Sequence, residues 1–226
     1  MNRPEPEGRA ALKIKICGIR DEETLGQTIR AGADMVGFMH FTKSPRHLEP
    51  ERIAQMIARA DKKTKTVVVL VNPGDGLVKT ISALKPDFIQ LHGNETVARV
   101  QAVRKLSGTK IIKVLPVATA EDLSDIKAFN DVADRILLDA KPPKGASRPG
   151  GLGEVFDWNL LLELDPAFEF MLSGGLSPHN VAEAVRRVGP WGIDISSGVE
   201  SAPGVKDMTL VGAFINNARA AEKAKN

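Results

Sequence analysis

Two side chains in this sequence have the chemistry of proton-transfer catalysts, and each stands at the end of an apolar run. Cys17, the only cysteine, ends the segment 12–17, and Asp139 ends the segment 135–139. A cysteine can act as a base when its pKa falls far enough to form the thiolate. A carboxyl group can act as an acid when its surroundings keep it protonated. If the fold brings these two segment ends together, Cys17 and Asp139 form a pair of one base and one acid.

Structural roles for both residues stay open at the level of the sequence. A free cysteine is most often a small buried apolar residue. A carboxylate after a strand can simply accept hydrogen bonds from loop N–H groups. The glycine- and proline-rich segment 141–153 follows Asp139, and a loop of this kind after a strand favours a functional role for the carboxylate.

Two glycine-containing loops, 173–175 and 196–198, follow the last two apolar runs. Glycine lets the backbone adopt positive φ and approach an anion closely. Barrels of β/α units commonly bind phosphate after strands seven and eight. The sequence therefore predicts a phosphate site, although ordinary tight turns would leave the same pattern. The residues expected to bind phosphate are Gly174, Gly175, Ser197 and Gly198.

Three further polar side chains are candidates for substrate binding. Arg46 follows the second apolar run, and its guanidinium could bind a carboxylate bidentately or belong to a solvated basic turn. His92 and Asp194 stand at the ends of the fourth and eighth runs. Each could hydrogen-bond the substrate or tie down its own loop.

Neither a metal nor a nucleotide cofactor is expected. The four histidines, at positions 40, 47, 92 and 179, show no metal-ligand spacing, and one cysteine cannot build a multi-cysteine zinc site. No Gly-x-Gly-x-x-Gly motif follows the first apolar run, which disfavours a dinucleotide-binding fold.

The elements that must position these residues alternate regularly along the chain. Predicted strands lie at 12–17, 34–39, 66–71, 88–91, 110–115, 135–139, 169–172 and 192–195, with Pro116 ending the fifth. Predicted helices lie at 21–30, 50–60, 76–84, 95–106, 120–128, 158–163, 178–188 and 207–223. Nearly continuous apolar runs are typical of parallel strands buried on both faces. Eight such units predict an α/β fold, a single (β/α)8 TIM barrel, with an open doubly wound sheet as the rival.

Composition narrows the class of protein. The chain has 226 residues, 42% of them hydrophobic and 26% charged, with a net charge of +3. This charge is too small to indicate a nucleic-acid or membrane partner, and no apolar run is long enough to span a bilayer. A single cysteine and the absence of a signal peptide favour a cytoplasmic protein. We expect a flexible N-terminal extension at 1–11 and one catalytic domain at 12–226.

A series of segments, in order from about residue 13 to residue 207, resembles phosphoribosylanthranilate isomerase. The matching segments are Lys15-Ile16-Cys17-Gly18-Ile19, Gly37-Phe38, Lys43-Ser44-Pro45-Arg46, Val71-Asn72-Pro73, Gln90-Leu91-His92-Gly93, Leu138-Asp139, Phe156-Asp157-Trp158, Leu172-Ser173-Gly174-Gly175-Leu176, Asp194-Ile195-Ser196-Ser197-Gly198-Val199-Glu200 and Pro203-Gly204-Val205-Lys206-Asp207. Any one match is weak, whereas the ordered set is highly specific.

The resemblance implies a (β/α)8 barrel that works without a cofactor in tryptophan biosynthesis. The implied reaction is the Amadori rearrangement of N-(5-phosphoribosyl)anthranilate to 1-(2-carboxyphenylamino)-1-deoxyribulose 5-phosphate. Cys17 is then the general base and Asp139 the general acid. The glycine loops hold the ribose phosphate, and Arg46 stabilises the anthranilate end.

Departures from the family pattern occur in two loops and at one strand end. The segment 39–42 replaces the aromatic-proline sequence that is more usual before Lys43. The loop after Asp139 is longer and more basic, and Ser173 stands where the family often has Ala. Alternatives that share the phosphate loops are the histidine-pathway aminosugar isomerase, indole-glycerol-phosphate synthase and a non-catalytic phosphosugar-binding module. The expected partner is a small phosphosugar, and the chain is a monomer or a homodimer.

Overall fold

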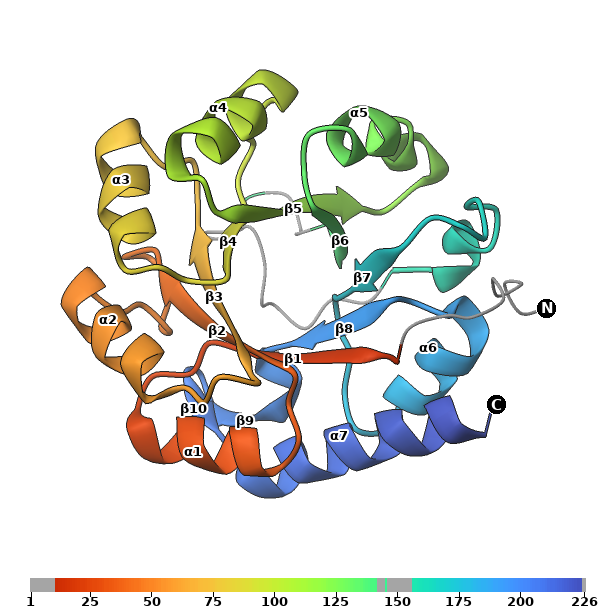
Figure 1. The fold of residues 1–226 in the computed structure, drawn as a ribbon. Helices are drawn as coiled ribbons and strands as arrows, with labels where there is room; N and C mark the ends of the chain where they lie inside the picture. The colour runs from red at the N-terminus through yellow and green to blue at the C-terminus, as the bar shows by residue number, and fades with distance from the viewer. Residues whose placement is uncertain (1–10, 142–144, 146–155, 225–226) are drawn as a thin grey trace.

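A computed structural model describes residues 11–141, 145 and 156–224 (Figure 1). All but the last residue of the predicted extension at 1–11 and most of the predicted loop at 141–153 lie outside the described residues, so these two predictions are not tested. Among the helices of the described ranges, none combines the length and the apolarity needed to cross a membrane.

Eight parallel strands close into a barrel in sequence order, with β1 paired to both β2 and β8. The strands are β1 (Lys13–Cys17), β2 (Met35–His40), β3 (Lys65–Leu70), β4 (Phe88–Leu91), β5 (Lys110–Val117), β6 (Arg135–Ala140), β7 (Phe170–Leu172) and β8 (Gly192–Ile195). The predicted TIM barrel is therefore confirmed, and the open sheet is wrong because none of the strands β1 to β8 is left as an edge.

Helices surround the strands on the outside, as Figure 1 shows. The α-helices are α1 (Glu22–Arg30), α2 (Pro50–Arg59), α3 (Asp75–Ala83), α4 (Val97–Ser107), α5 (Ile126–Asn130), α6 (Val181–Val188) and α7 (Met208–Lys223). The 3₁₀ helices are η1 (Ala120–Leu123), η2 (Trp158–Leu161) and η3 (Ser197–Val199).

Two predicted helices are wrong in detail. The segment 120–128 splits into η1 and α5, because a capping box of Thr119 and Asp122 closes one tight turn and the following Ser-Asp pair favours a turn. The segment 158–163 forms only η2. Asp165 precedes a proline there, and the residue before proline avoids the helical conformation.

Two strand predictions also differ. β5 continues through Pro116 to Val117, and Pro116 pairs with Asp139 of β6. Pairing with β4 ends at Lys113, so beyond that residue one side of β5 has no partner strand. The N–H group that Pro116 lacks would have had no strand to bond there, and the proline is tolerated. A short antiparallel hairpin of β9 (Glu200–Ala202) and β10 (Val205–Lys206) was not predicted.

The strands carry two sets of side chains, as the period of two requires. One set packs against the helices and belongs to the large outer core. The other lies inside the barrel, where the described apolar cluster is Met35, Val67, Ile112, Val114, Leu137, Met171 and Trp191. Toward the C-terminal ends, several inward-facing positions carry buried polar side chains instead, among them Lys15, Gln90, Asp139 and Asp194.

Candidate active site

Cys17 is the last residue of β1 and lies at the C-terminal mouth of the barrel, where barrel enzymes place their active sites. The residue is only 5% exposed. Its carbonyl oxygen accepts a hydrogen bond of 3.0 Å from the Ser196 hydroxyl of the loop after β8. The chain then turns at Gly18, whose φ of +81° is readily adopted by glycine. Cys17 is thus held between two strands rather than on a free loop.

Lys15 is a charged neighbour of Cys17 that the sequence analysis did not single out. Its side chain is fully buried, and its Nζ lies 2.9 Å from Asp194 Oδ1. Burial raises the pKa of the Cys17 thiol, whereas the charge of Lys15 opposes that rise. Burial by itself would lower the pKa of Lys15, but Asp194 and Cys17 outweigh it and the pKa is raised. Lys15 therefore stays an ammonium group beside the thiol.

Asp194 was predicted to bind substrate or to tie down its own loop. In the structure its carboxylate is engaged with Lys15, a residue 179 positions away in the chain. The carboxylate is buried and faces the barrel interior beside β1. Its contact is therefore to a neighbouring strand, and its role toward substrate stays a prediction.

Asp139 is the fifth residue of β6 and is also 5% exposed. Its Oδ1 accepts a hydrogen bond of 3.0 Å from the backbone N–H of Ala140. Its Oδ2 lies 3.2 Å from Nε2 of His92. The geometry of that contact is not a hydrogen bond, and Nε2 has no other partner among the described residues. The structure thus brings two predicted site residues, Asp139 and His92, into contact.

The loop that carries His92 is fixed by a buried ion pair that the sequence analysis missed. Glu95 Oε2 lies 2.6 Å from Nζ of Lys113, and both side chains are almost fully buried. The same carboxylate accepts the N–H groups of Asn72 and Gly93, and Lys113 also donates to the Gly93 carbonyl at 2.7 Å. These bonds hold the loops after β3 and β4 against β5.

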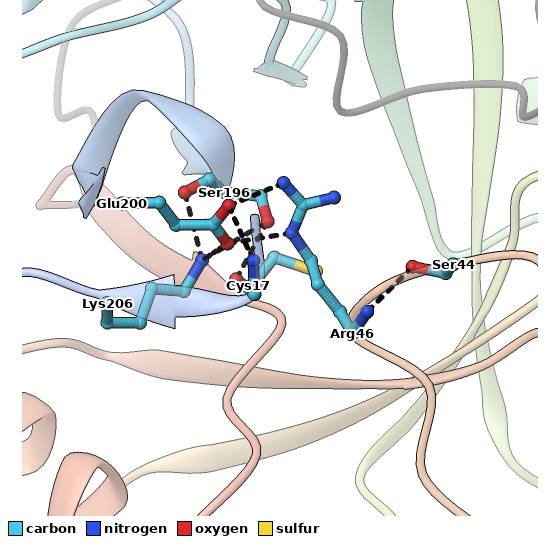
Figure 2. A network of polar contacts seen from close by, with 7 residues as sticks. Cys17, Ser44, Arg46, Ser196, Glu200 and Lys206 are labelled. Atoms are coloured by element: carbon cyan, nitrogen blue, oxygen red, sulfur yellow. Dashed lines mark hydrogen bonds and ion pairs between the residues drawn. The ribbon is translucent and has the colours of Figure 1, made fainter. Parts of the chain in front are cut away.

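Arg46 enters the mouth from the loop after β2 and is held by a buried network, which Figure 2 shows. Its Nε and Nη2 each donate to Glu200 at 2.7 Å, so the pair is bidentate. Glu200 Oε1 lies 2.8 Å from Nζ of Lys206, which also donates to the Ser196 carbonyl at 2.9 Å. The hairpin of β9 and β10 places Glu200 opposite Lys206.

The charges of this network act on one another. Burial would raise the pKa of Glu200, but the hydrogen bond from Arg46 and the charge of Lys206 outweigh it, so the pKa is lowered. Burial lowers the pKa of Lys206 despite the opposing effect of Glu200. The carboxylate is therefore ionised and shared between two cations.

The Arg46 geometry refines what the sequence predicts. The bidentate pair is made with the carboxylate of Glu200, and the third guanidinium nitrogen, Nη1, has no hydrogen-bond partner among the described residues. The side chain packs over Gly18, where an added Cβ would lie 2.5 Å from Arg46 Cδ. Arg46 thus lies beside the end of β1, and its role toward the anthranilate end of the substrate stays a prediction.

The two predicted glycine loops lie side by side at the mouth. Gly174 and Gly175 have φ values of +87° and +60°, and among described residues no hydrogen bond is recorded for their backbone N–H groups. A Cβ at Gly174 would lie 2.5 Å from the Ala140 nitrogen, and one at Gly198 would overlap the Leu176 carbonyl. Free N–H groups at glycines, which have no side chain in the way, are suited to an anion, so the geometry is compatible with the predicted phosphate site.

Among the described residues, one group of side chains has the donor atoms for a metal ion, although histidine spacing in the sequence indicated none. His40, His47 and Glu49 offer ligand atoms that lie within 4.8 Å of one another. His40 Nδ1 is 2.9 Å from the Leu48 carbonyl, and His47 Nε2 is 3.0 Å from Glu49 Oε1. These contacts explain the grouping without an ion. His40 alternates with the inward-facing Met39, so the group lies outside the barrel.

The comparisons with known proteins agree with the geometry. Residues 14–217 match the family model described as N-(5'phosphoribosyl)anthranilate (PRA) isomerase. The N-(5'-phosphoribosyl)anthranilate isomerase of Rhodopseudomonas palustris (strain BisB18) is 52% identical over 213 residues, which cover 94% of this chain and 98% of the relative.

Solved structures show the same likeness. The phosphoribosyl anthranilate isomerase from Thermotoga maritima is similar with a TM-score of 0.84 and 33% identity, covering 92% of this chain and 99% of that one. A phosphoribosyl anthranilate isomerase in complex with reduced 1-(O-carboxyphenylamino)-1-deoxyribulose 5-phosphate has a TM-score of 0.81 and 31% identity, with the same coverage.

Proposed function

Because the chain belongs to the N-(5'-phosphoribosyl)anthranilate isomerase family, we propose that Cys17 and Asp139 are the base and the acid of its reaction. The chain is an enzyme, an isomerase of tryptophan biosynthesis, and the resemblance found in the sequence is confirmed. The observation that supports the proposal is that the two side chains are buried at the same mouth of the barrel, on β1 and β6. The glycine loops of β7 and β8 lie at that mouth too.

Asp139 acts first, by donating its proton to the ribose ring oxygen. The bond between C1 and the ring oxygen breaks, and the lone pair of the anthranilate nitrogen forms a C=N bond, so the ring opens to a protonated Schiff base. Asp139 is left as a carboxylate. We assign the stabilisation of that new charge to His92, whose Nε2 lies 3.2 Å from Oδ2.

Cys17, as the thiolate, then takes the proton from C2. The electrons of the C–H bond form a C=C bond, and the electrons of the C=N bond return to nitrogen, which gives an enolamine. Tautomerisation of the enolamine yields the ketone product. Positioned acid and base groups are each typically worth about 10²- to 10⁴-fold in rate. Every step is a proton transfer, so the scheme requires no cofactor.

The orientation of the substrate follows from the groups that we assign to its two charged ends. We assign the ribose phosphate to the backbone N–H groups of Gly174 and Gly175, together with Ser197 and Gly198 at the start of η3. The anthranilate carboxylate is assigned to Nη1 of Arg46, because Glu200 occupies the other two nitrogens. Binding both ends places C1 and C2 between the base and the acid.

The test is turnover of N-(5-phosphoribosyl)anthranilate, followed as loss of the substrate's fluorescence, in the wild type and in Cys17→Ala and Asp139→Asn. We expect Cys17→Ala to be nearly inactive and Asp139→Asn to lose about 10²-fold or more in kcat while still binding reduced product. Normal turnover by either variant would remove that residue from the scheme. An Asp139→Asn variant that loses affinity alone would make Asp139 a binding residue.

The nearest alternative is a related barrel that isomerises a histidine-pathway aminosugar phosphate. Assaying that class of substrate beside N-(5-phosphoribosyl)anthranilate measures which one the site accepts. We expect the anthranilate substrate to be preferred, since Arg46 supplies a positive group for its carboxylate. The state of the chain as monomer or homodimer is a separate prediction, which light scattering during gel filtration measures.

A further inference from the structure

The proposed base poses a physical problem that the structure itself answers. Cys17 is buried, and burial raises the pKa of its thiol, because a charge is poorly solvated inside a protein. A thiolate at this position therefore needs a fixed positive charge nearby. Among the residues that the structure describes, three cations lie around the mouth near Cys17: Lys15, Arg46 and Lys206.

Arg46 and Lys206 both form ion pairs with Glu200. Arg46 donates two hydrogen bonds to that carboxylate, and Lys206 donates one. Their positive charge is largely compensated within their own network. Lys15 is the cation whose influence on the thiol is largest.

Lys15 is placed toward Cys17 by the strand geometry. The two residues are two positions apart on β1, so their side chains emerge on the same inner face of the barrel. Across from them on β2 stands Gly37, paired with Cys17. A Cβ at Gly37 would lie 2.7 Å from Cys17 Sγ and 3.2 Å from Lys15 Nζ. The sulfur and the ammonium nitrogen thus flank one small space, which exists because residue 37 has no side chain.

Asp194 fixes the other side of the ammonium. Its Oδ1 lies 2.9 Å from Lys15 Nζ, and the two residues are register partners between β1 and β8. Burial by itself lowers the pKa of a lysine, but Asp194 and Cys17 both act against that effect and keep Lys15 charged. The carboxylate also opposes ionisation of the thiol, so Lys15 stands between two groups that compete for it.

We propose that Lys15 is a positioning residue that stabilises the Cys17 thiolate, with Asp194 holding the ammonium in place. The inference rests on the proposed role of Cys17 as the base. The proposal adds a line of three groups, Cys17–Lys15–Asp194. In this line the positive charge of Lys15 determines how readily the Cys17 thiol ionises. A purely structural ion pair between Lys15 and Asp194 is the competing explanation.

The composition of the chain makes the thiol directly measurable. It has one cysteine and no tyrosine, so the ultraviolet absorbance that appears at alkaline pH as a thiolate forms reports Cys17 alone. Cys17→Ala is the blank. The measurement needs no substrate, so it tests Lys15 even if Cys17 proves not to be the base.

We expect Lys15→Met to raise the midpoint of thiolate formation by about 1 to 3 pH units, the effect of losing a nearby opposite charge. Asp194→Asn should lower the midpoint, since it removes a negative charge from the same line. Shifts in opposite directions are not expected from loss of packing. Lys13→Met, on the same strand and partly exposed, is the matched control and should leave the midpoint unchanged.

Activity gives the second readout. At neutral pH the kcat/KM of Lys15→Met should fall by about 10-fold or more, and raising the pH should restore part of it, because each pH unit changes the thiolate fraction tenfold. If Lys15→Met does not fold, the double variant Lys15→Met/Asp194→Asn avoids leaving a lone buried carboxylate and is measured in its place. Its thiol should titrate above that of Asp194→Asn.

Two results overturn the inference. An unchanged thiol midpoint in Lys15→Met, or in the double variant relative to Asp194→Asn, would make the Lys15–Asp194 pair structural only. A loss of activity in Lys15→Met that is the same at every pH would do likewise. In contrast, normal turnover by Cys17→Ala would refute the proposed base while leaving the thiol titration interpretable.

Discussion

Replacing Glu200 by Gln should destabilise the protein more than any exposed charge change. The substitution keeps the size of the side chain and removes the negative charge that Arg46 and Lys206 share. All three side chains are 4% exposed or less, so two buried cations are left without their partner. Breaking a buried ion pair by removing one member typically costs about 3–5 kcal/mol. For a chain of this size we expect Tm to fall by about 6–20 °C.

The loss should depend on pH in a defined direction. The pKa of Glu200 is lowered in the folded protein from its ordinary value of 4.5. A group with a depressed folded pKa stabilises the fold above its unfolded pKa, and this contribution disappears as the pH falls through the folded value. The difference in unfolding free energy between wild type and Glu200→Gln should therefore be largest near neutral pH and should narrow below pH 4.5.

Urea denaturation followed by circular dichroism, at neutral and at acid pH, measures this difference. The matched control is Glu183→Gln, since Glu183 pairs with Arg187 on the surface of α6 at 3.3 Å and its side chain is 60% exposed. We expect the control to cost about 0.5 kcal/mol or less. The reasoning is refuted if Glu200→Gln costs no more than the control, or if its cost does not change with pH.

Three further substitutions test the mouth of the barrel. Arg46→Ala should raise KM for the anthranilate substrate while inorganic phosphate still competes; loss of phosphate inhibition would move Arg46 into the phosphate site. Cys17→Ser should be as inactive as Cys17→Ala, because a hydroxyl ionises far less readily than a thiol, and near-normal turnover would exclude the thiolate. Gly37→Ala should lower kcat with little effect on phosphate inhibition, since its Cβ would lie 2.7 Å from Cys17 Sγ; unchanged kcat would show that the space beside the sulfur is dispensable.

Much of the fold was predictable because its signals are local. Apolar runs and helical spacing are read over a few residues, and all eight strands lie within a few residues of their predicted places. The location of Cys17 and Asp139 was predictable for the same reason, since a residue at the end of a parallel strand must lie at the mouth of a barrel. The error at 120–128 arose where turn-forming side chains competed with helix formation, and the error at 158–163 arose where a proline follows closely.

The partners of the site residues could not be read from the sequence. Arg46 binds Glu200 across 154 positions, and Lys15 binds Asp194 across 179. Such pairs form because barrel closure brings the first and last strands together, and no local pattern specifies which side chains then meet. Glu95 and Lys113 likewise show their role only as a buried pair.

The sequence by itself therefore determined the barrel, the identity of the chemical groups and the end of the molecule at which they lie. Only the tertiary structure decided their electrostatic state. Three features depend on side-chain positions across the closed barrel: the burial of Cys17, the ammonium of Lys15 beside it and the ion pair of Arg46 with Glu200. The physical reason is that secondary structure follows from neighbours along the chain, whereas the free energy of a charge follows from its neighbours in space.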